Sequence, residues 1–303
     1  MKLIHTCHVQ NTYSASNWSF EDTYKLLFDL DGSILEVGYF IHYKDVYSRQ
    51  PIEHVIELPS SVGCPFRCAF CASSLLPYKR KLTSTELVSL FAVILTTYGL
   101  CKDDCILVSF TGIGDFAHST DEIISFIDTV NSKYANIEFT LSSCQWSPDL
   151  FSLADELVKK KYPIRYFQIA YIAHPNVLRE KRIIPAALKA MCSLDQIVEH
   201  IRQSDNSCYR INYVMIEGVN DDEYSFNQFA SLVVQIQSRI LIRISRMNIT
   251  EASKRNNLLP PSLEDMQKFK TILSSLSVNS YLFYAEKNDN MNCGQLIANY
   301  LKK

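Results

Sequence analysis

From residue 54 onward, runs of β-branched and aromatic residues alternate with stretches whose apolar residues recur at helical spacing. This alternation is typical of βα units arranged around a parallel sheet or barrel. The pattern predicts six strands, each followed by a stretch that can form a helix. The six strands are expected over residues 54–60, 105–110, 137–142, 164–172, 210–216 and 239–245.

Several segments carry more specific signals for how an element begins or ends. The order Thr83-Ser84-Thr85-Glu86 predicts a capping box at the start of the first helix, because the side chains of Thr83 and Glu86 can bond each other's backbone N–H groups. Near the end of the chain, residues 262–276 predict a helix and residues 278–285 an extended segment. A short helix is expected to close the chain.

The first fifty residues follow a different pattern. Asp31-Gly32 lies between two apolar runs, which is a strong short-range signal of a β-hairpin. We therefore expect an N-terminal β-hairpin extension over residues 1–50 and one large domain, with a C-terminal segment, over residues 51–303. The longest apolar stretch, residues 87–95, is interrupted by Ser89 and is far shorter than the roughly 20 residues of a membrane helix.

Composition and charge narrow the class of protein. The chain has 303 residues, 47% hydrophobic and 20% charged, which is typical of a globular protein and excludes a disordered or collagen-like chain. Its first residues contain no apolar signal core, so a cytoplasmic location is expected. The net charge of -2 provides no general attraction to nucleic acid, so RNA binding would depend on local basic patches.

Three of the ten cysteines fall within eight positions, in Cys64-Pro65-Phe66-Arg67-Cys68-Ala69-Phe70-Cys71. In a reducing compartment such a group favours a metal site over disulfides. Three cysteines can hold three irons of a 4Fe-4S cluster and leave the fourth iron open. Zinc would require a fourth ligand, and no further Cys or His lies close in the sequence. Three buried apolar cysteines are the other alternative.

This loop, with an aromatic residue before its last cysteine and a predicted strand before it, resembles the radical S-adenosylmethionine (SAM) superfamily. The resemblance implies an α/β fold, a partial (β/α)6 TIM-like barrel with chemistry at the carboxyl ends of its strands. It also implies that Cys64, Cys68 and Cys71 hold a 4Fe-4S cluster. In this superfamily the open iron binds the amino and carboxylate groups of SAM, whose reductive cleavage gives a 5'-deoxyadenosyl radical.

Further motifs, in order along residues 24–300, resemble the RlmN/Cfr family of radical SAM adenosine methyltransferases. The family's additional N-terminal helical domain, implicated in RNA binding, is not expected in this chain. The motifs are Val62-Gly63-Cys64, Thr111-Gly112-Ile113-Gly114-Asp115, Thr140-Leu141-Ser142-Ser143, Pro175-Asn176, Leu178-Arg179, Pro185, Tyr213-Val214-Met215, Gly218-Val219-Asn220-Asp221, Asn248 and Cys293-Gly294-Gln295-Leu296.

These motifs imply a set of SAM-binding residues. Two glycines at a strand end allow the backbone to approach a ligand closely, and Asp115 could accept hydrogen bonds from the SAM ammonium, where the family usually has Glu. The serines and Asn248 could bond the SAM carboxylate or ribose. Each of these residues could also serve only in a turn or a cap. The implied set is Gly112, Gly114, Asp115, Ser142, Ser143 and Asn248.

By the same resemblance, Cys293 accepts a methyl group from one SAM molecule, and the radical made from a second SAM then activates that methyl group for addition to adenine. A second family cysteine deprotonates the adduct and releases the carrier as a disulfide, but this chain has Glu57 at that position. A carboxylate can act as a base but cannot form a disulfide. One hypothesis is that Cys144, at the end of the third predicted strand, supplies the missing thiol.

The leading interpretation is therefore a radical SAM enzyme that methylates an adenine-containing substrate, RNA or a nucleotide, and receives electrons from a flavodoxin or ferredoxin. Basic residues at 79–81 and 179–182 are candidates for phosphate contacts. The first alternative is a radical SAM enzyme whose 5'-deoxyadenosyl radical acts directly on a non-RNA substrate. The second is a catalytically silent iron–sulfur or RNA-binding protein.

Overall fold

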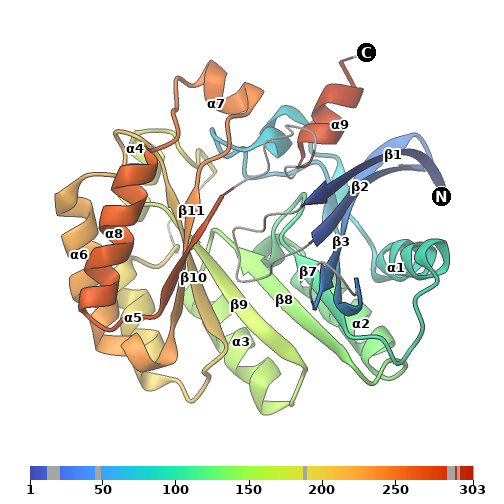
Figure 1. Ribbon diagram of the computed structural model, residues 1–303, viewed down its shortest axis with the longest axis horizontal. Coiled ribbons are helices and arrows are strands. Elements are labelled where there is room, and N and C mark those ends of the chain that lie inside the picture. Colours follow the sequence, from blue (N-terminus) through green and yellow to red (C-terminus); the bar gives the residue numbers. More distant parts are fainter. Residues whose placement is uncertain (12–20, 45–48, 187–189, 285–290, 292–293, 303) are drawn as a thin grey trace. The chain divides into compact units, whose positions relative to one another are not determined.

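The structure is a computed structural model with two compact units (Figure 1). Unit 1 comprises Met1–Pro65, Ala72–Ser142 and Glu286–Lys303, and unit 2 comprises Phe66–Cys71 and Ser143–Ala285. Each unit is described by itself below. The structure describes residues 1–11, 21–44, 49–186, 190–284, 291 and 294–302.

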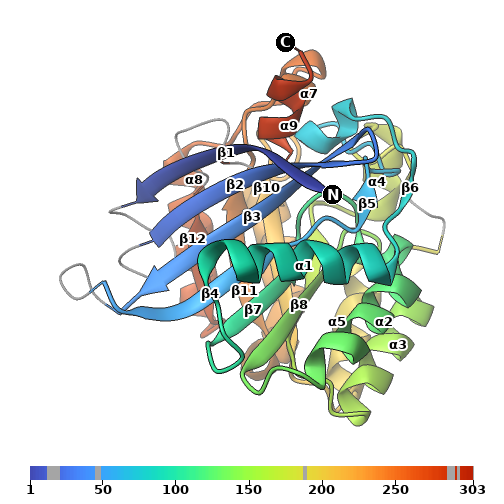
Figure 2. The same ribbon diagram turned by 90° about the vertical axis from the view of Figure 1, so that its right-hand side faces the viewer.

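Unit 1 begins with an antiparallel group of strands, visible on the left of Figure 2. Strands β2 and β3 form the predicted hairpin, in which Asp31 and Gly32 have φ angles of 50° and 79°. Positive φ at both central residues is typical of the type I′ turn that matches strand twist. The hairpin is therefore confirmed. The strands are β1 (Lys2–Asn11), β2 (Glu21–Leu30), β3 (Ser33–Tyr43) and β4 (Pro51–Glu57).

The pairing in unit 1 then changes from antiparallel to parallel. β4 pairs in parallel with β7, and β7 pairs in parallel with β8. The helices pack through aromatic edges, with Phe126 of α2 lying 5.8 Å from Phe91 of α1 and 5.6 Å from Phe110 of β7. The remaining elements of unit 1 are β5 (Ser61–Val62), η1 (Ala72–Leu75), β6 (Arg80–Lys81), α1 (Ser84–Tyr98), β7 (Ile106–Phe110), η2 (Phe116–His118), α2 (Thr120–Asn131), β8 (Ile137–Ser143) and α9 (Gln295–Tyr300).

Unit 2 contains a parallel sheet in the order β9-β10-β11-β12. The six predicted strands correspond to β4 and β7–β11, and the extended segment predicted near residue 280 corresponds to β12. The elements of unit 2 are α3 (Pro148–Lys159), β9 (Ile164–Tyr171), α4 (Pro175–Glu180), α5 (Leu194–Gln203), β10 (Tyr209–Met215), α6 (Glu223–Val233), η3 (Val234–Arg239), β11 (Leu241–Arg246), α7 (Glu251–Arg255), α8 (Leu263–Ser275) and β12 (Ser280–Phe283).

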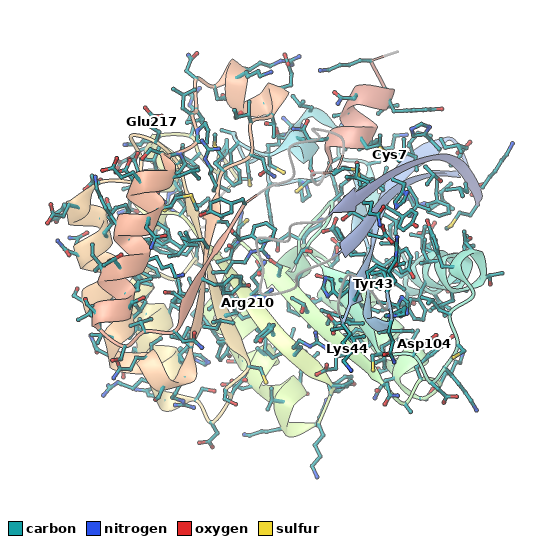
Figure 3. The ribbon with its side chains drawn as sticks, in the orientation of Figure 1. Cys7, Tyr43, Lys44, Asp104, Arg210 and Glu217 are labelled. Atoms are coloured by element: carbon teal, nitrogen blue, oxygen red, sulfur yellow. The ribbon has the colours of Figure 1, made fainter. Side chains whose placement is uncertain are left out.

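The two faces of the sheet in unit 2 differ in chemistry. Along β10 the buried positions alternate with half-buried ones, as expected of a strand with one face in a core. On the buried face, Tyr213 packs 4.7 Å from Phe229 of α6 and 4.7 Å from Phe269 of α8. The opposite face carries Arg210, which is labelled in Figure 3, and Asn212. Within the described ranges, none of the helices has the length and apolarity that a membrane crossing requires.

Replacing Phe269 by Ala tests how strongly unit 2 depends on this aromatic core. Phe269 is fully buried and its ring also stacks on Phe226 at 4.6 Å. We expect Phe269→Ala to lower the free energy of unfolding by about 3–5 kcal/mol, because it leaves a cavity. The control Leu263→Ala, on the same helix but 55% exposed, should change it by less than about 0.5 kcal/mol. Urea denaturation measures both, and similar losses for the two variants would contradict the assignment.

Candidate active site

The cysteine loop begins where unit 1 makes a tight turn. Gly63 has a φ of 72°, and a Cβ atom there would lie 2.3 Å from the backbone oxygen of Pro77. Only glycine fits this position without moving the backbone. Cys64, the next residue, is buried. In unit 2, the backbone N–H of Cys71 donates to the carbonyl of Cys68 at 3.1 Å, so the second half of the loop is a compact turn.

The chemistry of these three cysteines fits an iron–sulfur cluster, because none of the three is in a disulfide within the part of the chain that the structure describes. The described residues contain no group of three or more His, Cys, Asp or Glu side chains already arranged to hold a metal ion. The donor types thus support a cluster, and the cluster itself stays a prediction.

The glycine-rich segment at the end of β7 packs against the loop that precedes Gly63. Gly114 has a φ of 105°, and a Cβ atom there would lie 2.1 Å from Oγ of Ser60. The backbone N–H of Ser60 donates to the carbonyl of Ile113 at 2.8 Å. One carboxylate oxygen of Asp115 accepts from the backbone N–H of Ala117 at 2.9 Å and caps η2. The glycines therefore serve close backbone packing inside unit 1, and SAM binding by this segment stays a prediction.

The other predicted SAM-binding residues occupy strand ends. Ser142 is half-buried at the end of β8, and Asn248 is half-buried just beyond β11. Ser143 is buried, and its hydroxyl accepts from the backbone N–H of Gln145 at 2.9 Å, which is a turn role. In unit 2, Cys144 packs against the same apolar cluster as Cys68. The cluster consists of Ile172, Leu178, Ile183, Ile184, Met191, Ile216 and Met247.

Glu57, by contrast, belongs to a buried group of charges in unit 1. Nζ of Lys25 lies 2.7 Å from Oε1 of Glu57 and 3.8 Å from Oε1 of Glu36. Side-chain exposure is 1% for Lys25, 2% for Glu36 and 15% for Glu57. Thr111 donates to Oε2 of Glu57 at 3.2 Å, and the Cβ position of Gly112 is 3.3 Å from Glu57. Two predicted site residues, Glu57 and Gly112, are therefore neighbours.

Glu36 connects this group to the C-terminal segment. Its two carboxylate oxygens accept from the backbone N–H groups of Gly294, at 2.8 Å, and Ile297, at 3.0 Å. Burial raises the pKa of Glu36, and the Lys25 ammonium and the two backbone N–H groups oppose this rise. Cys293 lies outside the described residues, but its neighbour Gly294 is held by Glu36. Glu36 thus anchors the segment that carries the predicted methyl carrier.

Sequence reasoning missed Lys25 and Glu36. A signal was available, since both stand among the apolar residues of the predicted hairpin, in Tyr24-Lys25-Leu26-Leu27 and Ile34-Leu35-Glu36-Val37. A charged residue within a buried strand is rare unless it is paired.

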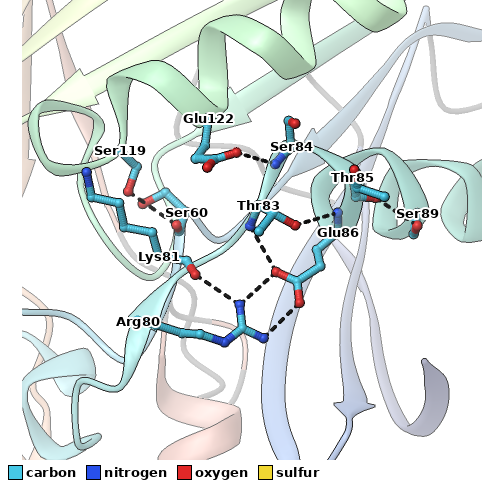
Figure 4. A network of polar contacts seen from close by, with 10 residues as sticks. All are labelled: Ser60, Arg80, Lys81, Thr83, Ser84, Thr85, Glu86, Ser89, Ser119 and Glu122. Carbon is cyan, nitrogen blue, oxygen red and sulfur yellow. Dashed lines mark hydrogen bonds and ion pairs between the residues drawn. The ribbon is translucent and has the colours of Figure 1, made fainter.

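The basic residues proposed for phosphate contacts are partly engaged within the protein. The guanidinium of Arg80 forms two hydrogen bonds of 2.7 Å with the carboxylate of Glu86 (Figure 4). Glu86 also completes the predicted capping box with Thr83, which is confirmed. Arg179 donates to the side chain of Asn176 at 2.5 Å. Contacts between RNA and the basic residues at 79–81 and 179–182 stay predictions.

Comparison with known proteins finds relatives of similar sequence, although no family model matches the chain. The protein described as "Probable dual-specificity RNA methyltransferase RlmN" of Clostridium novyi (strain NT) is 28% identical over 294 residues, covering 94% of this chain and 78% of the relative. A protein of the same description from Staphylococcus carnosus (strain TM300) is 24% identical over 286 residues, covering 92% and 74%.

Two solved structures are similar over three quarters or more of this chain. A radical SAM methyltransferase from Sphaerobacter thermophilus superposes with a TM-score of 0.75 at 17% identity, covering 97% of this chain and 80% of that one. Spore photoproduct lyase complexed with dinucleoside spore photoproduct gives a TM-score of 0.52 at 10% identity, covering 76% of each chain. The expected α/β fold, a partial (β/α)6 barrel of the radical SAM type with an N-terminal β extension, is confirmed.

Fold, motifs and relatives together support an enzyme. The chain is similar to a radical SAM methyltransferase in fold and to proteins described as RlmN in sequence, as the sequence resemblance predicted.

Removing the Lys25 ammonium tests the buried charge group. We expect Lys25→Met to lower the free energy of unfolding by about 3–5 kcal/mol at neutral pH, because two carboxylates lose their cation. Burial raises the pKa of Glu36, and this variant lacks the opposing effect of Lys25. The folded variant therefore takes up a proton more readily than the unfolded chain, so it gains stability as the pH falls from neutral towards the ordinary carboxyl range. Urea denaturation at two pH values measures this difference.

The matched control is Lys2→Met, because Lys2 is exposed on β1. It should change stability by less than about 0.5 kcal/mol at either pH. A loss for Lys25→Met that is the same at both pH values would show that Lys25 acts through packing rather than through its charge.

Proposed function

We propose that the chain is a radical SAM methyltransferase that methylates an adenine base in RNA or in a nucleotide, with Cys293 as methyl carrier. The relatives described as RNA methyltransferases support the reaction class. The observation that carries the proposal is the contact sequence Gly294–Glu36–Lys25–Glu57 in unit 1. It joins the neighbour of Cys293 to the carboxylate that stands where the family has its second cysteine.

Cofactor binding follows from the cysteine loop and the strand ends. Cys64, Cys68 and Cys71 would hold a 4Fe-4S cluster, and the segment from Gly112 to Asp115, with Ser142, Ser143 and Asn248, would contact SAM. When bound, the cluster and SAM supply a carbon-centred radical through reductive cleavage of SAM. A flavodoxin- or ferredoxin-type reductant in the cytoplasm would provide the electron.

The residues of the chain then have distinct tasks. Cys293 would accept a methyl group on its sulfur, and SAM, when bound, would supply that group and leave as S-adenosylhomocysteine. Glu57 is the base that takes a proton from the methylated adenine adduct. The Lys25 ammonium, at 2.7 Å, and the hydroxyl of Thr111, at 3.2 Å, orient the two carboxylate oxygens of Glu57 for this task. Glu36 holds the carrier segment through Gly294.

Release of the carrier sulfur requires a group other than Glu57, because a carboxylate cannot form a disulfide with it. Cys144 is the thiol we propose for this step. In support, Cys144 is half-buried and not in a disulfide among the described residues, and within unit 2 it packs on the apolar cluster that Cys68 also contacts.

Mapping the mass of the Cys293 peptide tests the methyl-carrier proposal. The protein is reconstituted with iron and sulfide without oxygen, then incubated with SAM and reductant. We expect a single added methylene on Cys293 and none in Cys293→Ala, whereas Cys101→Ser, which removes an exposed cysteine, should be modified like wild type. SAM cleavage with an unmodified Cys293 would favour direct hydrogen abstraction from a non-RNA substrate, and a protein that fails to bind SAM would favour the silent alternative.

Glu57→Gln tests the proposed base. We expect turnover to fall by about 10²–10⁴-fold, with methylation of Cys293 intact and the covalent RNA adduct accumulating, because the amide cannot accept the proton. The control is Glu53→Gln, which changes a carboxylate on the same strand, β4. The Oε2 atom of Glu53 lies 3.2 Å from Nδ1 of His42. Cys144→Ala should also accumulate adduct. Normal turnover by Cys144→Ala would exclude that cysteine from release.

A further inference from the structure

The half-buried face of the sheet in unit 2 carries two arginines on adjacent strands. In the parallel register, Arg210 of β10 is opposite Leu241 of β11, and Arg243 is opposite Asn212. Since residues two apart on a strand share a face, both arginines lie on the face opposite the aromatic core. Figure 3 labels the side chain of Arg210. No step of the proposed reaction uses either residue.

Arg210 is held firmly but its charge is not balanced. One terminal nitrogen donates to Oε1 of Gln168 at 2.7 Å, and the guanidinium lies 4.4 Å from the centre of the Tyr166 ring. Its Nε atom is buried and has no hydrogen-bond partner among the described residues. Within that same part of the chain, no carboxylate oxygen lies within 4.0 Å of this guanidinium.

Such an arrangement costs stability unless an anion is present. A cation that leaves water without an opposite charge is unfavourable, and an unsatisfied buried N–H adds to that penalty. Consistent with this, burial lowers the pKa of Arg210, against smaller opposing effects of Tyr281 and Tyr166. Proteins tolerate this kind of local instability mainly where a ligand compensates for it.

The neighbouring side chains are suited to a polar ligand. The guanidinium of Arg243 stacks 3.4 Å from the centre of the Phe283 ring, which fixes a second positive charge on the same face. Between the strands, the hydroxyl of Ser245 donates to the side-chain oxygen of Asn212 at 2.5 Å. Besides Leu241, which is opposite Arg210 on β11, this face therefore carries a second cation, an amide and a hydroxyl.

We propose that this face binds the phosphate group of a nucleotide substrate through Arg210. The guanidinium fork matches a phosphate, which can accept two parallel N–H bonds. The proposal deepens the proposed function, on which the choice of a nucleotide rests. It adds an anchoring point for the substrate remote from the cysteine loop in sequence.

The test compares adenosine 5'-monophosphate with adenosine as probes by calorimetric titration of the full-length protein. Wild type is expected to bind the monophosphate more tightly than adenosine. Arg210→Gln should weaken binding of the monophosphate by about 10- to 100-fold and leave adenosine unchanged, because the lost bond is to a charged group. Arg210→Lys keeps the charge but not the fork, so its affinity for the monophosphate should lie between those of wild type and Arg210→Gln. Arg202→Gln, which removes an exposed charge paired with Glu199, is the control.

Stability distinguishes a binding role from a structural one. Without ligand, Arg210→Gln should unfold at the same or a higher urea concentration than wild type, because an unbalanced cation is removed. The proposal would be overturned if wild type bound the monophosphate no more tightly than adenosine. It would also be overturned if Arg210→Gln were less stable than wild type and bound both probes more weakly to the same degree. Loss of SAM binding alone would identify the anion as the SAM carboxylate and overturn it as well.

The binding test for Arg210 and the methylation test for Cys293 can fail independently of each other. A preference for the monophosphate that depends on Arg210, found in a protein whose Cys293 is never methylated, would support the phosphate site while contradicting the carrier role. A methylated Cys293 without that preference would do the reverse.

Discussion

The ammonium of Lys25, buried between Glu36 and Glu57, is the interaction on which the architecture of unit 1 depends. It balances two carboxylates that would otherwise be very costly to bury. Through Glu36 it also reaches the backbone of Gly294 and Ile297, and so joins the N-terminal hairpin to the last helix. The apolar side chains of Leu27, Ile113, Leu296 and Ile297 pack beside this junction. A polar centre with an apolar surround therefore holds three distant segments together.

Lys25 in unit 1 and Arg210 in unit 2 differ in how their positive charges are balanced. Lys25 has its counter-charges inside the protein, whereas Arg210 has an amide and an aromatic ring but no carboxylate among the described residues. The first arrangement is complete within the fold and stabilises it. The second remains incomplete until an anion arrives, which is how a protein can reserve binding energy for a ligand. The same physical cost thus separates a structural charge from a candidate binding charge.

The sequence was sufficient for most of the fold, because periodicity and turn chemistry are local. The alternation of βα segments predicted β4 and β7–β11, and Asp31-Gly32 predicted the hairpin. The partnership of Lys25 with Glu57 could not be predicted in this way, because 32 residues separate them and strand pairing brings them together. The packing of Gly114 against Ser60 could not be predicted either, and its proposed approach to SAM stays a prediction. Local sequence patterns indicate which elements form, whereas the contact partners of a residue depend on tertiary packing.

The bond between Glu36 and Gly294 spans 258 residues of the chain. During synthesis the hairpin that contains Glu36 emerges long before its backbone partners, which follow all of unit 2. Contacts of such sequence separation form late, because their loop-closure entropy is large. Until then the Glu36 carboxylate lacks two of its donors, so unit 1 stays incomplete. The segment that begins at Gly294 therefore docks only after unit 2 has been synthesised, and a chain that stops within unit 2 would keep the cysteine loop but lack Cys293.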